Sequence, residues 1–176
     1  VMFIITGGGS GLGKALAVTL AHRGKSVLIV GRRQKLLEDT ASLSPLIQYL
    51  TADISTEEGR HLLLHHVHVP YVKALINNAG TIKPISSLKE LSSADWQQAL
   101  NTNVGAPLFL TQMLYDKLQD GRVLNIGSGA AYFAIKGWAA YCVSKAALSM
   151  LTKCWQLESK TIAFGSVMPG IVDTDM

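Results

Sequence analysis

The sequence has 176 residues, of which 48% are hydrophobic and 7% are aromatic, and its formal net charge is +4. These values exclude a disordered chain, and the absence of a Lys/Arg run or a membrane-length apolar run argues against nucleic acid-binding and membrane-spanning proteins. They predict one domain, residues 1–176, large enough to bury a hydrophobic core.

The chain opens on a strand, a glycine turn and a helix. The apolar run Val1–Ile5 is typical of a buried parallel strand, and apolar residues recur at helical spacing from Leu12 onward. Between them, Gly7, Gly11 and Gly13 let the backbone turn sharply and approach a phosphate, which the amino end of the helix favours. A glycine turn without a ligand is the alternative.

A second strand, Ser26–Val30, ends where a dinucleotide-binding unit recognises its ribose. Gly31 brings no carboxylate for a 2′-hydroxyl, whereas Arg32 suits a 2′-phosphate through charge-assisted hydrogen bonds. Arg33 adds a second positive charge whose direction the sequence leaves open. We therefore expect a dinucleotide with a 2′-phosphate, as in NADP(H), in preference to one with a free 2′-hydroxyl, as in NAD(H), with dual specificity or a solvated arginine pair as the alternatives.

Three further elements follow. The sequence predicts a helix over Gln34–Ala41 and a strand over Leu46–Thr51, followed by Asp53. Ser55 and Glu58 form a predicted capping box, with Ser55 as N-cap of a helix that ends near His66. On this helix, His61 and His65 have the spacing of two metal ligands, but no third ligand has matching spacing, so we predict a polar face and no metal site.

The strand Val72–Ile76 runs into the polar turn Asn77–Gly80, at the sheet edge where ligands bind in open α/β folds. Ser92 signals the start of a long helix that ends near Lys117. Mid-helix Asn and Gly are costly, and Pro107 disfavours a regular helix, so we predict a kink or a functional contact around Asn101, Asn103 and Gly105.

The remaining elements complete an alternating pattern. The strand Val123–Ile126 ends at Gly127-Ser128-Gly129, the helix Ala139–Gln156 follows, and the strand Ile162–Met168 ends at Pro169-Gly170. Because crossovers between parallel strands are right-handed, the pattern predicts a three-layer α/β/α fold with a doubly wound parallel sheet in the order 3-2-1-4-5-6.

Chemistry is concentrated on the helix Ala139–Gln156. Tyr141 and Lys145 are four residues apart and share one helix face, and a nearby ammonium favours a phenolate. Such a tyrosine exchanges protons with a substrate oxygen, to which Ser128 can donate a hydrogen bond. Apolar and aromatic residues between Ser128 and Tyr141 are expected to line the substrate pocket, with core packing as the alternative: Tyr132, Phe133, Ile135 and Trp138.

The two cysteines, Cys142 and Cys154, fall on the same predicted helix about 18 Å apart at 1.5 Å per residue. This separation is too large for a disulfide, so we expect free thiols in a reducing cytoplasm. We also expect no signal peptide, because the sequence opens directly on a strand.

Taken together, these motifs make the sequence resemble the short-chain dehydrogenases/reductases. The match runs over essentially the whole chain: T-G-G-G-S-G-L-G (Thr6–Gly13), N-N-A-G (Asn77–Gly80), Asn103 in N-V-G, Ser128, Y-C-V-S-K (Tyr141–Lys145) and P-G (Pro169, Gly170). The resemblance implies a Rossmann-type fold, a nicotinamide cofactor and a carbonyl/alcohol couple.

The resemblance also implies roles for individual residues. Tyr141 would be the acid/base, Ser128 would orient the substrate oxygen, Lys145 would contact the nicotinamide ribose, and Asn103 would hold a water of the proton relay. Asp53 and Ile54 would meet the adenine, Asn78–Gly80 the adenosine ribose, and Ile171 and Thr174 the carboxamide. With Arg32 and Arg33, the expected cofactor contacts are Gly7, Gly9, Ser10, Gly11, Leu12, Gly13, Asp53, Ile54, Asn78, Ala79, Gly80, Tyr141, Lys145, Pro169, Gly170, Ile171 and Thr174.

The family pattern normally continues into a substrate-covering helix and a further strand, so we expect the C-terminal part to be missing from this sequence. We predict an NADP(H)-dependent carbonyl reductase acting on a small carbonyl or alcohol substrate, without nucleic acid or membrane partners. The long helices favour a homodimer or homotetramer. The alternative is a catalytically silent dinucleotide-binding regulator, whereas a phosphate-binding NTPase is excluded because no G-K-[ST] follows the glycines.

Overall fold

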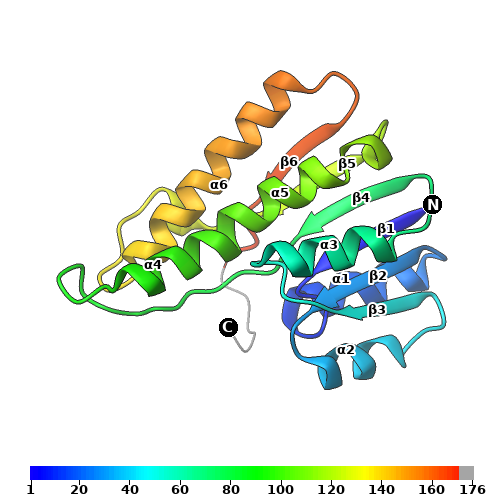
Figure 1. The fold of residues 1–176 in the computed structure, drawn as a ribbon, viewed down its shortest axis with the longest axis horizontal. Coiled ribbons are helices and arrows are strands. Elements are labelled where there is room, and N and C mark those ends of the chain that lie inside the picture. Colours follow the sequence, from blue (N-terminus) through cyan, green and yellow to red (C-terminus); the bar gives the residue numbers. More distant parts are fainter. Residues whose placement is uncertain (171–176) are drawn as a thin grey trace.

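The computed structural model describes residues 1–170 and contains a six-stranded parallel sheet between two helical layers (Figure 1). The strand order is β3-β2-β1-β4-β5-β6, which confirms the predicted order. The strands are β1 (Met2–Thr6), β2 (Ser26–Gly31), β3 (Ile47–Thr51), β4 (Val72–Asn77), β5 (Arg122–Ile126) and β6 (Ala163–Val167).

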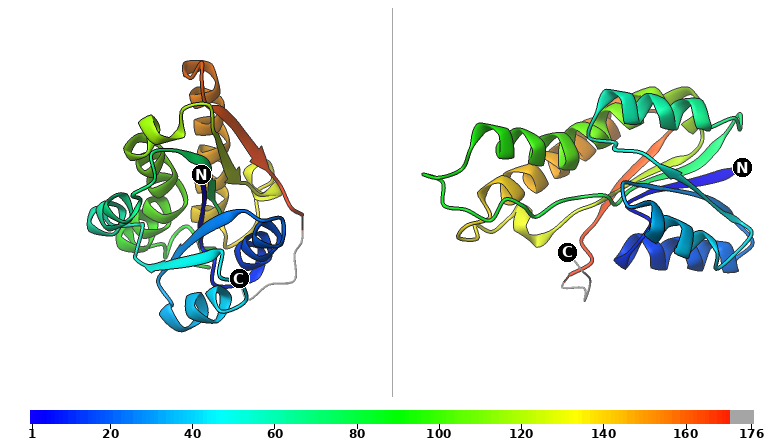
Figure 2. Two further views of the ribbon diagram at one scale, coloured as in Figure 1. Left: turned by 90° about the vertical axis from the view of Figure 1, so that its right-hand side faces the viewer. Right: turned by 60° about the horizontal axis from the view of Figure 1, so that its bottom comes forward.

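Helices cover both faces of the sheet (Figure 2). One layer holds α1 (Gly11–His22) and α2 (Gln34–Ala41), and the other holds α3 (Glu57–His66), α4 (Ser93–Leu100), α5 (Ala106–Met113) and α6 (Ala139–Glu158). Short 3-10 turns lie at Tyr115–Leu118 and Gly129–Ala131. Among residues 1–170, none of the helices has the length and apolar character needed to cross a bilayer.

The buried core is divided by the sheet because neighbouring residues of a strand point to opposite faces. Ile4 and Leu28 pack in the cluster that includes Leu63 of α3 and Leu110 of α5, whereas Ile5 belongs to the cluster with Ala17 of α1. Both sheet faces are therefore apolar, which explains why the first two strands read as continuous apolar runs.

The long helix predicted to end near Lys117 is interrupted by an irregular turn. A π-helical turn, Asn101–Gly105, joins α4 to α5, and Pro107 lies in the first turn of α5. The predicted interruption is therefore confirmed as a π-helical turn. Such turns inside helices often occur at functional sites.

The predicted capping box of α3 is wrong by one residue. The N-cap is Thr56, whose hydroxyl accepts a hydrogen bond from the Gly59 N–H at 3.1 Å. The Asp53 carboxylate accepts hydrogen bonds from both the N–H and the hydroxyl of Ser55, at 3.0 and 2.7 Å, and this turn occupies the residue expected to cap the helix. The second predicted cap is confirmed, because the Ser92 hydroxyl accepts from the Asp95 N–H.

Candidate active site

The expected site residues converge because all six strands are parallel. Their carboxyl ends meet at one edge of the sheet, and each end continues into a segment in which a site residue was expected. From β3 to β6 along the sheet, these segments are Asp53–Ile54, Gly31–Arg33, Gly7–Gly13, Asn78–Gly80, Gly127–Gly129 and Pro169–Gly170. Ile171 and Thr174 lie outside the described residues.

The glycine turn between β1 and α1 is packed so tightly that side chains are excluded. A Cβ on Gly13 would lie 2.2 Å from the carbonyl oxygen of Gly7, and Gly7 itself has a φ of +69°. Ser10 is the N-cap of α1, but its side chain makes no capping hydrogen bond. No side chain therefore caps the first N–H groups of the helix, which leaves them available to an anion.

Asn78 and Thr6 hold this turn against the end of β4. The Asn78 amide donates to the carbonyls of Thr6 and Gly7, at 3.0 and 3.1 Å, and the buried Thr6 hydroxyl accepts from the N–H groups of Asn78 and Ala79. The Asn78 side chain thus fixes the glycine turn. The sequence analysis placed Thr6 at the start of the glycine motif but did not foresee that its hydroxyl accepts hydrogen bonds from the segment after β4.

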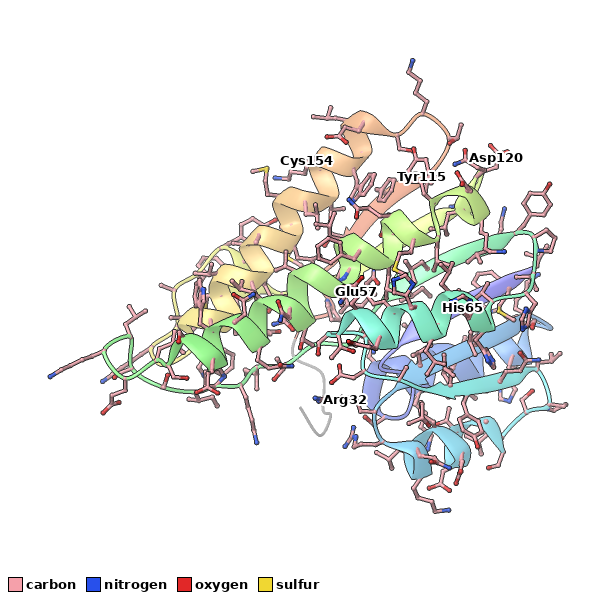
Figure 3. All side chains as sticks on the ribbon, in the orientation of Figure 1. Arg32, Glu57, His65, Tyr115, Asp120 and Cys154 are labelled. Carbon is pink, nitrogen blue, oxygen red and sulfur yellow. The ribbon has the colours of Figure 1, made fainter. Side chains whose placement is uncertain are left out.

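The two arginines after β2 differ in their surroundings. The Arg33 guanidinium donates to the Ser10 hydroxyl at 2.8 Å, which ties the end of β2 to the glycine turn. Arg32 is exposed, like Arg33, and lies just past the carboxyl end of β2 (Figure 3). The structure therefore resolves the direction of Arg33, which the sequence left open.

The turn after β3 is linked to the helical layer that contains α3 and α4. The Gln98 amide of α4 donates to the Ser55 hydroxyl at 3.3 Å, and Arg60 donates to the Ile54 carbonyl at 3.0 Å. Arg60 also lies over the ring of Phe109, 5.0 Å from its centroid. These contacts, together with the Asp53 turn, fix the backbone at the edge where the adenine is expected.

Tyr141 and Lys145 lie in the first two turns of α6, and both are buried, with 8% and 5% of their surface exposed. The Lys145 ammonium lies 5.7 Å from the centroid of the Tyr141 ring and donates to the Ile126 carbonyl of β5 at 2.8 Å. Burial lowers the pKa of Lys145 to about 8. The predicted pair therefore shares one helix face, and its cation is held in a poorly solvated position.

Ser128 lines a cavity together with Lys145. It follows β5 and caps the 3-10 turn Gly129–Ala131, where its hydroxyl accepts from the Ala130 N–H at 3.2 Å. Ser128 and Lys145 line the same small cavity of about 70 Å³, together with Tyr132 and Ser149. The structure thus brings the hydroxyl of Ser128 and the ammonium of Lys145 to one space.

Asn103 lies in the π-helical turn and is almost fully buried. Its Oδ1 accepts from the Thr81 N–H at 2.8 Å, and its Nδ2 donates to the Thr81 carbonyl and to the Ser144 hydroxyl, both at 2.9 Å. The Asn103 side chain therefore links the segment after β4 to α6. The role of Ser144 in this arrangement was not foreseen from the sequence.

The segment between Ser128 and Tyr141 has mixed surroundings. Trp138 packs edge-on against the Tyr141 ring, with centroids 5.9 Å apart, whereas Phe133 and Ile135 are exposed. Tyr132 is exposed at its ring and shares a hydrogen bond with Ser149 at 3.3 Å. Apolar surface thus lies beside the first turns of α6, and a substrate-binding role for it stays a prediction.

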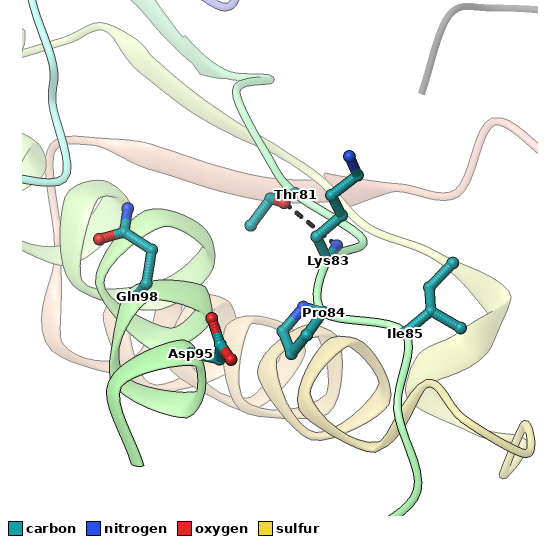
Figure 4. Close-up of a pocket in the computed structure, with 6 residues that line it drawn as sticks. All are labelled: Thr81, Lys83, Pro84, Ile85, Asp95 and Gln98. Carbon is teal, nitrogen blue, oxygen red and sulfur yellow. Dashed lines mark hydrogen bonds between the residues drawn. The ribbon is translucent and has the colours of Figure 1, made fainter. Parts of the chain in front are cut away.

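A larger cavity, of about 420 Å³, lies between α4 and the segment that follows β4 (Figure 4). Its walls are Thr81, Lys83, Pro84, Ile85, Asp95 and Gln98, and the Lys83 N–H donates to the Thr81 hydroxyl at 3.1 Å. None of the proposed catalytic side chains lines this cavity. The larger cavity therefore lacks the Ser128 and Lys145 side chains that line the smaller one.

Within the described part of the chain, both cysteines are free and lie on α6, as expected. No group of three metal-ligating side chains gathers among residues 1–170. The ring of His61 instead lies 6.4 Å from that of His65 and within 3.6 Å of the Glu57 carboxylate.

The family model and three similar proteins point to the same family. The family model for short chain dehydrogenases matches residues 2–176. Benzil reductase ((S)-benzoin forming) of Bacillus subtilis is 34% identical, over 99% of this chain and 76% of its own length. L-xylulose reductase of Caenorhabditis elegans is 32% identical (98% and 72% covered), and NADPH-dependent pterin aldehyde reductase of Arabidopsis thaliana is 33% identical (98% and 75% covered).

Solved structures agree with the sequence relatives. A crystallised short-chain dehydrogenase/reductase of Saccharomyces cerevisiae superposes with a TM-score of 0.92 at 25% identity. The superposition covers 99% of this chain and 72% of the yeast chain.

Proposed function

Since this chain belongs to the short-chain dehydrogenase/reductase family and is therefore an oxidoreductase, we propose that it interconverts a ketone and a secondary alcohol with NADP(H). The observation that carries this proposal is the buried Lys145 ammonium, which lies beside the Tyr141 ring and lines one cavity with Ser128. This arrangement supports a site in which Tyr141 would be the general acid, Lys145 its charge partner and Ser128 the hydrogen-bond donor to the reacting oxygen.

The residues at the sheet edge fit a dinucleotide. The open backbone around Gly7 and Gly13, with the free N–H groups of α1, would hold the pyrophosphate, and Asp53 and Ile54 would meet the adenine. Asn78–Gly80 would meet the adenosine ribose, and Lys145 would lie at the nicotinamide ribose. The nicotinamide supplies the hydride when it is bound.

The chain's own residues manage the proton and the substrate oxygen. In reduction, the Tyr141 hydroxyl donates a proton to the carbonyl oxygen, and the Ser128 hydroxyl orients that oxygen by a hydrogen bond. The Lys145 ammonium stabilises the tyrosinate that remains. Asn103 holds the segment after β4, next to Lys145, at the place where a proton would return from water.

The preference for NADP(H) is supported by charge at the end of β2. Arg33 is held toward the glycine turn by Ser10, and Arg32 is free to fold over a 2′-phosphate. Gly31 brings no carboxylate that would repel this group. The printed name of the plant relative, an NADPH-dependent reductase, agrees with this preference.

For the substrate, we propose a modest-sized and partly apolar carbonyl compound. Phe133, Ile135 and Trp138 supply apolar surface next to Tyr141, and one relative is named for its action on benzil, a diaryl diketone. We further propose a cytoplasmic enzyme of one domain that forms a homodimer or homotetramer and needs neither nucleic acid nor a membrane.

The decisive experiment compares the wild type with Tyr141→Phe in NADPH consumption, using benzil, 2,3-butanedione and xylulose as probes. We expect wild-type turnover of at least one ketone and a loss on the order of 10²- to 10⁴-fold in Tyr141→Phe, because general acid catalysis contributes about that much. NADPH binding, followed by cofactor fluorescence, should persist in the variant. Cofactor binding without any turnover in the wild type would favour the alternative, a catalytically silent dinucleotide-binding regulator.

A further inference from the structure

The amide of Asn103 has its orientation fixed by only two partners. The side chain offers two N–H donors, and these go to the Thr81 carbonyl and the Ser144 hydroxyl, both at 2.9 Å. Its oxygen accepts from the Thr81 N–H at 2.8 Å. Thr81 contributes only backbone groups. Among the described residues, Ser144 is therefore the one side chain whose hydrogen bond helps to set the orientation of the Asn103 amide.

Ser144 is completely buried and lies on α6 between Tyr141 and Lys145. Its hydroxyl donates its single proton to the Tyr141 carbonyl at 2.8 Å, so toward Asn103 it can only accept. One hydroxyl therefore joins the backbone of the proposed acid/base to the π-helical turn. A buried N–H that loses its acceptor is costly, so the Asn103 amide depends on this hydroxyl.

The Asn103 amide and the Lys145 ammonium both come close to Gly80. A Cβ at Gly80 would lie 3.4 Å from Asn103 Oδ1 and 3.6 Å from Lys145 Nζ, so both polar atoms approach the same point of the backbone. A rotation of the Asn103 amide would disturb this arrangement directly beside the Lys145 ammonium.

We propose that Ser144 is a positioning residue for the reaction, holding the Asn103 amide against α6 so that Asn103 and Lys145 keep their places around Gly80. The inference rests on the proposed function, because it concerns the proton-handling side of that site. Ser144 itself touches neither substrate nor cofactor in this scheme, and it acts through Asn103.

Thr152 provides a matched control on the same helix. It is also buried, its hydroxyl donates to a carbonyl of its own helix, that of Leu148, at 2.8 Å, and it accepts from the Asn125 amide at 2.9 Å. Thr152→Val therefore removes the same kind of buried hydrogen bonds as Ser144→Ala, but two helical turns away from Lys145. Both substitutions are expected to lower Tm by similar amounts.

The test measures kcat, the KM for NADPH and Tm, with benzil as substrate. In Ser144→Ala we expect kcat to fall about tenfold, since small misplacements of reacting groups have effects of this order or larger. The KM for NADPH should stay within about twofold of wild type in Ser144→Ala, and kcat should stay within about twofold in Thr152→Val. Ser144→Cys replaces the hydroxyl by a slightly larger thiol that leaves no cavity and forms weaker hydrogen bonds, so it should fold and show the same direction of change.

A double substitution separates positioning from general destabilisation. If Ser144 acts through Asn103, adding Ser144→Ala to Asn103→Ala should lower kcat no further. The inference is overturned if the loss is the same in both backgrounds, if Thr152→Val loses as much kcat, or if both Ser144 variants keep wild-type kcat. A wild type that turns over no ketone would instead contradict the proposed function.

Discussion

At the scale of single residues, cofactor choice depends on two neighbouring arginines with different surroundings. Both arginines are exposed, but Arg33 is already oriented toward the glycine turn by its hydrogen bond to Ser10, whereas Arg32 would have to be ordered by the cofactor. An ordered side chain loses less conformational entropy on binding, so Arg33 should contribute more to phosphate affinity.

We expect Arg33→Ala to lower the ratio of kcat/KM for NADPH to that for NADH by roughly 10- to 100-fold. This range corresponds to about 1.5–3 kcal/mol for hydrogen bonds to a charged group. Arg32→Ala should lower the ratio less. The measurement is initial rates with both cofactors in the wild type and the two variants, and a wild type that prefers NADH would contradict the assignment.

A second residue-scale prediction concerns pH. Burial destabilises the charged form of Lys145 and lowers its pKa to about 8, so the ammonium is present below that pH and is lost above it. Because the ammonium stabilises the tyrosinate formed during reduction, ketone reduction should slow as pH rises through about 8.

The check is the pH profile of kcat/KM for ketone reduction in the neutral to alkaline range. Lys145→Arg keeps its charge throughout this range, so its profile should lack the decline near the Lys145 pKa. A decline that survives unchanged in Lys145→Arg would show that another group titrates.

At the scale of elements, local patterns predicted where helices and strands lie, but not the contacts that set their ends. Asn103 has a low helix propensity, and its place inside a predicted helix correctly indicated an irregularity, which is the π-helical turn. The cap of α3 was wrong because Ser55 and Thr56 are both good N-caps. The choice between them depends on Asp53, which takes the Ser55 hydroxyl for its own turn.

Part of the polar network could be read from the sequence and part could not. Asn125 stands in an apolar strand, which signals a buried polar contact, and it donates to Thr152 and accepts from the Asn77 amide at 2.8 Å. The partner on α6 is 27 residues away along the chain, so no local spacing could identify it. The same reason hid the contact between Ser144 and Asn103.

At the scale of the whole molecule, the alternation of strands and helices determined the sheet order, because right-handed crossovers leave few arrangements. That order brings six strand ends to one edge, so motifs spread over the chain were predicted to meet. Their meeting follows from topology, whereas the hydrogen bonds among them follow from side-chain packing that only the structure shows.

The whole molecule also carries an apolar stripe outside its core. Val143, Met150 and Leu157 follow one another at intervals of seven residues on α6, about two helical turns, and are 47%, 58% and 88% exposed. Residues at this spacing lie on one helix face, and unpaired apolar faces are typical of association surfaces. The stripe is thus the surface on which we expect copies of this chain to meet.

We therefore expect the wild type to be a dimer or tetramer in light scattering and Met150→Glu to shift it toward the monomer, because a buried, unpaired carboxylate at an interface is strongly unfavourable. Gln156→Glu adds the same charge at an exposed neighbouring position of α6 outside the stripe, so it should leave the oligomer intact. Gln156→Glu should keep the wild-type Tm to within a few degrees, on the order expected for a surface substitution, whereas Met150→Glu should lose the part of Tm that association contributes. A wild type that is monomeric at micromolar concentration, or equal dissociation of both variants, would rule out α6 as the association surface.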